Sequence, residues 1–185
     1  TLRPYQIHRR QLDESESTVV YEEKDSKFNT YVSGSKTREY IFIGSASSTT
    51  SEERFISADK PNDSFKVFMP RTQDIEYFVY PHKDKFFVRY KDKENLNGKI
   101  YEAPLTGYED MSAWKEFVPH NKNIRIEGID ILKDYVLLEL RRNGLSEIVA
   151  KPISGDMDKS IDFPEPVYSA TLSGNPEYDS NTFRY

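Results

Sequence analysis

A pattern of strand-like segments recurs about every 47 residues along this chain of 185 residues. One set of segments begins at positions 40, 86, 135 and 183, so successive starts lie 46, 49 and 48 residues apart. These segments are Tyr40–Ile43, Phe86–Arg89, Tyr135–Leu138 and Phe183–Tyr185. A second set follows in the same register and consists of Arg54–Ser57, Lys99–Glu102 and Glu147–Ala150. Self-similarity at such a period favours folds that stack copies of one small unit.

Two further sets of segments complete the repeating unit. One set ends in proline, which suits an edge strand because an edge strand need not donate every ladder hydrogen bond. Its members are Phe65–Pro70, Trp114–Pro119 and Ser160–Pro164. The other set comes first in each unit and consists of Phe28–Ser33, Ile75–Tyr80, Ile126–Ile131 and Val167–Leu172. Each unit is therefore predicted to hold four short antiparallel strands.

Asn-Gly pairs lie at matching places in two of the units, at Asn97-Gly98 and Asn143-Gly144. Both residues of such a pair tolerate the positive φ that a tight two-residue hairpin turn requires. We therefore expect a hairpin turn at each pair. The segment closest to helical periodicity, Tyr108–Phe117, overlaps an expected outer strand, so no long helix is predicted.

Four-stranded antiparallel sheets at this spacing are typical of β-propeller blades. The chain is predicted to be all-β, a partial β-propeller of about four blades. The approximate repeats are 28–71, 75–119, 126–165 and an incomplete 167–185, all in one propeller domain, while residues 1–27 belong to a preceding blade. The alternative is a β-sandwich with accidental spacing. The strands and the turns repeat together, which favours the propeller.

The aromatic residues are mainly 13 Tyr and 11 Phe, against a single Trp. Tyr and Phe suit the half-buried pleated surface of a sheet. Since each blade buries its faces against its neighbours, we expect most of these side chains to form the core between blades. The first strand of each unit is expected to be the innermost.

Charge and composition exclude several functional classes. The net charge of −5 provides no broad basic surface for a phosphate backbone, so no nucleic-acid partner is expected. No apolar run is long enough to span a bilayer, so no membrane partner is expected either. Cysteine is absent, which excludes disulfides, thiolate zinc sites and cysteine nucleophiles from this chain. A cytoplasmic location is the default expectation.

The residues offer no constellation for catalysis, cofactor binding or metal binding. His8, His82 and His120 lie in expected loops without metal-ligand spacing, and we interpret them as solvated surface residues. Ser45–Ser51 fails the G-x-S-x-G nucleophile pattern and is interpreted as a polar hairpin connection. No glycine-rich phosphate loop occurs among the 8 glycines. The sequence therefore predicts no catalytic, cofactor-binding or metal-binding residue, and no cofactor.

Two acidic clusters, Asp13–Glu16 and Glu22–Asp25, have two interpretations. They could bind a cation or a basic peptide, or they could be solvated turns, which we favour. Asn62-Asp63-Ser64 matches a glycosylation sequon, which would matter only in a secreted protein.

Short words spread over the whole chain resemble one family. They include Tyr21–Asp25 with Lys27-Phe28, Ser47–Glu52, Met69–Arg71, Glu76-Tyr77, Ala103-Pro104, Pro119-His120, Glu127-Gly128, Asn143–Leu145, Phe163–Tyr168, Asn175–Glu177 and Arg184-Tyr185. In this order they resemble the propeller of the oligopeptidase B (protease II) branch of the prolyl oligopeptidase family of serine peptidases.

The resemblance implies a role beside an enzyme. Members of the family pair an α/β-hydrolase domain with a seven-bladed propeller that admits short peptides and excludes folded proteins. The oligopeptidase B branch cleaves after Arg or Lys, and its catalytic residues lie in the hydrolase domain. No residue here matches them, so the chain is expected to be non-catalytic, a fragment of about four blades whose parent is a serine peptidase. The implied partners are the hydrolase domain of the same parent chain and short basic peptides.

Two expectations remain open beside this one. A propeller can serve as a scaffold or as a peptide- or protein-binding module without any hydrolase, since fold alone does not select a function. Carbohydrate binding would suit the tyrosines, although their strand positions favour packing. Because an arc of four blades leaves a free face at each end, the isolated chain is expected to associate, to close irregularly, or to pack these faces against a second copy of itself.

Overall fold

The computed structural model describes residues 2–155 and 157–185. Within these residues the regular structure consists of strands and one short 3₁₀ helix, η1 (Met111–Ala113). The first strands are β1 Gln6–Arg9, β2 Thr18–Glu22, β3 Asn29–Gly34, β4 Tyr40–Ala46, β5 Ser51–Ser57, β6 Lys66–Val67 and β7 Glu76–Pro81. The remaining strands are β8 Lys85–Lys91, β9 Lys99–Pro104, β10 Lys115–Val118, β11 Ile124–Ile131, β12 Tyr135–Arg142, β13 Leu145–Pro152 and β14 Lys159–Ser160.

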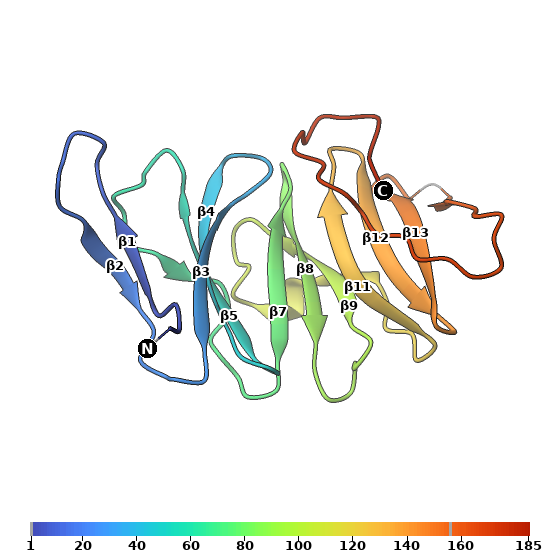
Figure 1. Cartoon of the computed structure of the whole chain (residues 1–185), viewed down its shortest axis with the longest axis horizontal. Coiled ribbons are helices and arrows are strands. Elements are labelled where there is room, and N and C mark those ends of the chain that lie inside the picture. The colour runs from blue at the N-terminus through green and yellow to red at the C-terminus, as the bar shows by residue number, and fades with distance from the viewer. Residues whose placement is uncertain (1, 156) are drawn as a thin grey trace. The chain divides into compact units, whose positions relative to one another are not determined.

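The described strands form three four-stranded antiparallel sheets and one two-stranded sheet (Figure 1). The orders are β1-β2, β3-β4-β5-β6, β7-β8-β9-β10 and β11-β12-β13-β14, so every sheet is a simple meander. Such meanders are the form of propeller blades. The predicted fold class is confirmed: the chain is all-β and is a partial β-propeller. The two-stranded sheet, β1 and β2, lies within residues 1–27, the segment that was expected to belong to a preceding blade.

The strands at the C-terminal end were predicted wrongly. The structure describes all of residues 161–185 and forms no strand there, although Val167–Leu172 and Phe183–Tyr185 were expected as strands. The backbones of Ser173 and Arg184 do meet, with the Ser173 amide donating to the Arg184 carbonyl at 3.0 Å. The Arg184 amide, however, donates to the side chain of Asn175 at 2.7 Å. A side chain that takes a backbone donor in this way competes with strand pairing.

The two Asn-Gly turns behave differently. Asn143 and Gly144 have φ of 52° and 84° and join β12 to β13 directly, so the predicted two-residue hairpin is confirmed. Gly98 also has a positive φ of 79°, but the Gly98 amide donates to the Asn95 carbonyl within a longer connection between β8 and β9. The prediction of a two-residue turn at Asn97-Gly98 was therefore wrong, because Asp92 already organises this loop by accepting from the Asn95 amide at 2.8 Å.

The chain divides into two compact units, residues 1–78 and 79–185, and the boundary falls inside β7. In the first unit, aromatic rings of the sheet β3–β6 are in contact, with ring centroids of Phe42 and Phe55 5.8 Å apart and those of Phe55 and Phe68 6.1 Å apart. Tyr77 packs 6.2 Å from Phe68, and its hydroxyl donates to the Met69 carbonyl at 2.6 Å. Burial raises the pKa of Tyr77, which keeps this hydroxyl a donor.

The core of the second unit lies between two blades. Buried side chains of β8 and β9, such as Phe87 and Ile100, pack with Val136, Leu138 and Val149 of β12 and β13. The aromatic packing continues to Phe117 of β10, whose ring centroid lies 5.0 Å from that of Phe87. The expectation that the apolar stripe forms core between blades is confirmed for this pair of sheets.

The opposite face of the sheet β11–β14 has a smaller apolar cluster. Leu132, Leu137 and Ala150 are buried there, and Leu172 and Phe183 of the C-terminal segment pack against them. No helix in the described part of the chain is long and apolar enough to cross a membrane.

Candidate functional site

The three histidines lie on separate elements. His8 is on β1 in the first unit, whereas His82 and His120 follow β7 and β10. His8 is exposed, as predicted, and its Nδ1 lies 3.1 Å from the Ser17 hydroxyl. Its Nε2 lies 3.3 Å from the side-chain oxygen of Gln6, which is a neutral amide. This exposed serine–histidine contact therefore lacks the carboxylate that orients the base of a catalytic triad.

His82 is buried, so its interpretation as a solvated residue was wrong. Only 8% of its surface is exposed, and its ring packs edge-on against Phe87 with centroids 5.8 Å apart. Its Nε2 lies 2.9 Å from the carbonyl oxygen of Lys133, in the turn between β11 and β12. The polar sequence around His82 suggested a surface turn, and burial comes from a segment 51 residues away.

The serines between β4 and β5 have two roles. Ser47 and Ser48 lie in the connection, as predicted, and the Ser47 hydroxyl donates to the Thr50 carbonyl at 3.3 Å. Ser45 and Ser51 instead belong to the strands and are fully buried. The Ser51 hydroxyl donates to the carbonyl of Tyr77 and accepts from its amide, both at 2.7 Å. The Ser51 hydroxyl therefore links β5 to the backbone of β7.

A buried charge cluster lies in the first unit. The guanidinium of Arg71 donates to Glu23 Oε2 at 2.5 Å, lies 3.5 Å from Glu52 Oε1, and stacks 3.7 Å from the centroid of the Phe28 ring. Burial alone would raise the pKa of Glu23, but hydrogen bonds from Arg71, from the Asp25 amide and from a tyrosine lower it to about 2. Glu23 was expected in a solvated turn and is only 5% exposed, so that interpretation was wrong.

The same cluster extends to a second arginine. Arg54 lies 2.5 Å from Glu52 and places its guanidinium 4.5 Å from the centroid of the Tyr21 ring. The Tyr21 hydroxyl donates to Glu23 at 2.8 Å and contacts the Ser45 hydroxyl at 3.0 Å. The network ties β2 to β4 and β5, and its charges are already paired, so its chemistry is structural. The other acidic cluster, Asp13–Glu16, is exposed as predicted.

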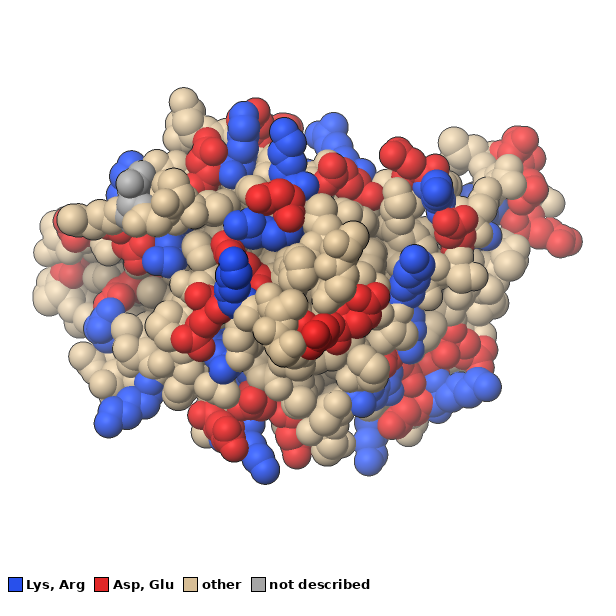
Figure 2. Space-filling model, turned by 180° about the vertical axis from the view of Figure 1, so that it is seen from behind, with Lys and Arg blue, Asp and Glu red and all other residues tan. Residues whose placement is uncertain are grey.

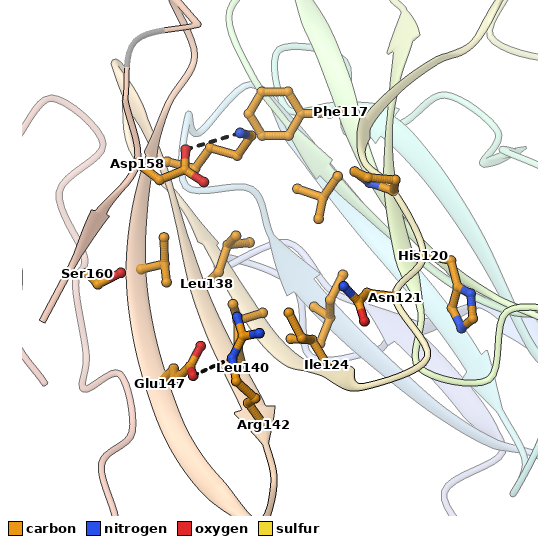
Figure 3. A pocket seen from close by; sticks show the side chains of 15 residues that line it. Phe117, His120, Asn121, Ile124, Leu138, Leu140, Arg142, Glu147, Asp158 and Ser160 are labelled. Atoms are coloured by element: carbon orange, nitrogen blue, oxygen red, sulfur yellow. Dashed lines mark hydrogen bonds and ion pairs between the residues drawn. The ribbon is translucent and has the colours of Figure 1, made fainter.

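The second unit has a groove of about 330 Å³ beside β10 (Figure 3). Its floor is apolar, with Ile124, Leu138 and Leu140 from β11 and β12. Two ion pairs also line the groove: Arg142 with Glu147 at 2.7 Å, and Lys151 with Asp158 at 3.1 Å.

The groove carries no reactive pair. His120 and Ser160 both line it but stand on opposite sides (Figure 3). In residues 2–155 and 157–185, no three His, Asp or Glu side chains come together to hold a metal ion. On the face seen in Figure 2, acidic and basic side chains are intermixed. The described residues thus provide blade packing, paired charges and an apolar groove.

The comparison with protein families decides the identity of this scaffold. The whole chain, residues 1–185, matches the family described as prolyl oligopeptidase, N-terminal beta-propeller domain. The chain belongs to this family. The resemblance found in the short sequence words is thereby confirmed.

Among curated proteins, this propeller is similar to two bacterial peptidases. It is 30% identical over 171 residues to dipeptidyl aminopeptidase BI of Pseudoxanthomonas mexicana, covering 92% of this chain and 23% of that protein. It is 29% identical over 181 residues to protease 2 of Moraxella lacunata, covering 97% of this chain and 25% of that protein. The chain thus spans about a quarter of the length of these relatives.

Among solved structures, the propeller resembles two oligopeptidases B. The enzyme from Trypanosoma brucei, in a closed form with covalently bound antipain, superposes with a TM-score of 0.89 at 24% identity, covering 96% of this chain and 27% of that one. The enzyme from Leishmania major gives a TM-score of 0.89 at 24% identity, covering 99% and 27%. At this identity the likeness establishes the fold alone, and in both of those structures the matched propeller segment is about a quarter of a longer chain.

Sequence reasoning missed the role of Arg71 as the cation of the buried charge cluster. It appeared only as the last letter of Met69–Arg71, a word that carried the family resemblance. Its partner Glu23 lies 48 residues earlier, about one repeat away, and no local pattern links the two. A possible sequence signal was the spacing, since Arg71 follows the acidic segment Glu22–Asp25 by about one repeat.

Proposed function

We propose that this chain is the non-catalytic propeller portion of an oligopeptidase B-like serine peptidase. In this proposal it gates the access of short peptides to a separate α/β-hydrolase domain, which cleaves after Arg or Lys. The observation that carries the proposal is the match of all 185 residues to the propeller family. The similarity to protease 2 and the superposition on oligopeptidase B support the choice of branch.

The side chains of the chain agree with a non-catalytic role. The Ser17–His8 contact ends on the amide of Gln6, and the buried Ser51 uses its hydroxyl within the backbone of Tyr77. The buried carboxylate Glu23 is held by Arg71 and is therefore not free to act as a proton donor near neutral pH. We expect the isolated chain to be inert toward any peptide substrate.

Gating by size is tested with one cleavage sequence in two contexts. The full-length protein is given an Arg-containing peptide, and the same sequence placed in a loop of a folded, stable protein. We expect the peptide to be cleaved and the folded protein to remain intact. As a control, trypsin should cut both. Equal cleavage of both by the full-length protein would refute the filter.

Specificity is tested with amide substrates that differ only in the residue before the scissile bond. We expect turnover after Arg and Lys and little after Pro, Leu or Glu. Preference for Pro would remove the assignment to the oligopeptidase B branch while leaving the family intact. Absence of all turnover, together with no labelling by a serine-reactive fluorophosphonate, would favour the scaffold alternative.

A second activity is suggested by the similarity to dipeptidyl aminopeptidase BI. Such an enzyme would release dipeptides from a free amino terminus. The two activities are separated by one pair of substrates, an Arg amide dipeptide with a free amino group and the same compound with the amino group blocked. Cleavage of the blocked compound supports the endopeptidase, and cleavage of the free compound alone supports the dipeptidyl aminopeptidase.

A further inference from the structure

The two Asn-Gly pairs of the second unit differ in how firmly the fold holds them. An asparagine that precedes glycine is prone to spontaneous deamidation, because glycine has no side chain that keeps its amide nitrogen away from the asparagine side chain. The reaction needs two things: a side-chain amide that is free to rotate, and a glycine N–H that is free to lose its proton. The hydrogen bonds of these two groups therefore decide how reactive each pair is.

Both groups are free at Asn143-Gly144. The pair forms the two-residue connection between β12 and β13, and both of its residues are exposed. Within residues 2–155 and 157–185, nothing forms a hydrogen bond with the Asn143 side chain or with the Gly144 amide. The Gly144 carbonyl accepts from the Arg141 guanidinium at 3.1 Å, and this contact leaves the glycine nitrogen free to react.

The same two groups are occupied at Asn97-Gly98. The Asn97 side-chain amide donates to the carbonyls of Asn121 and Lys122, both at 2.9 Å. The Gly98 amide donates to the Asn95 carbonyl at 2.9 Å, and Gly98 is buried. Deamidation at this pair therefore requires the loss of three hydrogen bonds before the ring can close.

The main chain around Asn97 is also held in place. The Asn97 carbonyl accepts from the Ile126 amide of β11 at 2.9 Å. Within the loop, Asp92 accepts from the amides of Glu94 at 2.9 Å and Asn95 at 2.8 Å. Such contacts must open before the pair can change its shape, so they reduce the reaction rate to the fraction of time for which the loop is open.

We propose that Asn143-Gly144 is a site of spontaneous deamidation in the folded protein, whereas the fold protects Asn97-Gly98. The Gly144 nitrogen loses its proton to solvent and forms a bond to Cγ of Asn143, the Cγ–Nδ2 bond breaks, and Nδ2 leaves as ammonia with a proton from solvent. Water then opens the cyclic imide. Hydrolysis at Cγ gives aspartate, and hydrolysis at the main-chain carbonyl carbon gives isoaspartate. In total, one water is consumed and one ammonia is released.

Both products change this end of the hairpin. Each carries a new carboxylate directly after Arg141 and Arg142, whose positive charges favour its ionised form. Isoaspartate also adds one main-chain atom between Arg142 and Leu145, which are paired in register across the turn. Because a two-residue turn fixes this register, we expect isoaspartate to open the paired ends of β12 and β13. Arg142 also lines the groove beside β10, so the modification would reach that groove.

The test compares the two pairs within one protein. The full-length protein is incubated in mildly alkaline buffer, digested at mildly acidic pH with an endoproteinase that cuts after lysine, and followed by mass spectrometry. Peptides 94–99 and 134–159 each contain one Asn-Gly pair. We expect deamidation to be at least roughly tenfold faster in peptide 134–159, because the other pair must first lose several hydrogen bonds. At a urea concentration that unfolds the protein, the two rates should become similar.

Three results would overturn the proposal: equal rates in the folded protein, a faster change at Asn97, or a change at Asn143 that occurs only in urea. Two variants make the test specific. Asn143→Gln should abolish the change in its peptide, because glutamine would have to close a larger ring. Asp92→Ala removes the acceptor that organises the other loop, so we expect deamidation at Asn97 to rise several-fold while that at Asn143 stays the same. An unchanged rate at Asn97 would contradict protection by that loop.

Discussion

Arg71 lies between two carboxylates of the first unit, 2.5 Å from Glu23 and 3.5 Å from Glu52. Its side chain is 25% exposed and covers the face of the Phe28 ring, so it contributes both charge and packing. A buried carboxylate left without its cation is strongly unfavourable. The free energy of unfolding should therefore depend heavily on this one side chain.

We predict that Arg71→Leu lowers the free energy of unfolding by about 3 kcal/mol, because Glu23 then remains buried without its partner. Arg142→Leu is the matched control, since it breaks an exposed ion pair and should cost less than about 1 kcal/mol. Urea unfolding of the 185-residue chain measures both. Equal losses in the two variants would contradict the central role of the cluster.

The acid stability of the chain should follow Glu23. Its pKa is about 2 in the folded chain and near its ordinary value of 4.5 when unfolded, so its charge stabilises the fold above that ordinary value. This contribution, about 3 kcal/mol, is lost as the pH falls from about 5 to about 2. In Glu23→Gln, the urea midpoint should be lower at neutral pH, and it should depend less on pH between about pH 5 and about pH 2. If the urea midpoint of Glu23→Gln changed with pH as steeply as that of the unchanged chain, Glu23 would not be the source of the acid dependence.

At the scale of the element, β4 depends on a close approach at Gly44. Tyr31 of β3 pairs with Gly44, and Gly44 pairs in turn with Glu53 of β5. The Tyr31 ring lies over Gly44, and its hydroxyl donates to Glu53 at 3.3 Å. A methyl group at Gly44 would overlap this ring. Three neighbouring strands are thus joined across a position that has no side chain.

We predict that Gly44→Ala costs about 2 kcal/mol of unfolding free energy, because the Tyr31 ring must move. The same change in a Tyr31→Ala background should cost less by about 1 kcal/mol, since the obstacle is gone. Gly34→Ala is the control: a methyl group there meets nothing within 4 Å, so we expect a change within about 0.5 kcal/mol. Additive effects of Gly44→Ala and Tyr31→Ala would contradict the contact.

At the scale of the whole molecule, blades bury their apolar faces against other blades. In the second unit, Leu132, Leu137 and Ala150 pack with Leu172 and Phe183 of an irregular segment rather than with strands. Because this segment forms no strand hydrogen bonds with the sheet, the face of another blade could displace it from the apolar cluster.

We therefore predict that the isolated 185-residue chain self-associates through blade faces. Size-exclusion chromatography over a dilution series should show an apparent mass that falls as the protein is diluted. The full-length protein at the same concentrations is the control, because its further residues would cover these faces. A monomer that is independent of dilution would contradict self-association of the isolated chain.

The sequence by itself determined the period, the positions of most strands, the Asn143-Gly144 hairpin and the family. These features are local: alternation along a strand and turn chemistry depend on residues close in the chain. Only the tertiary structure decided that His82 and Glu23 are buried, that Arg71 pairs across 48 residues, and that residues 161–185 form no strand. Burial and the pairing of distant charges depend on which segments meet in space, and a strand needs a partner edge as well as a suitable sequence.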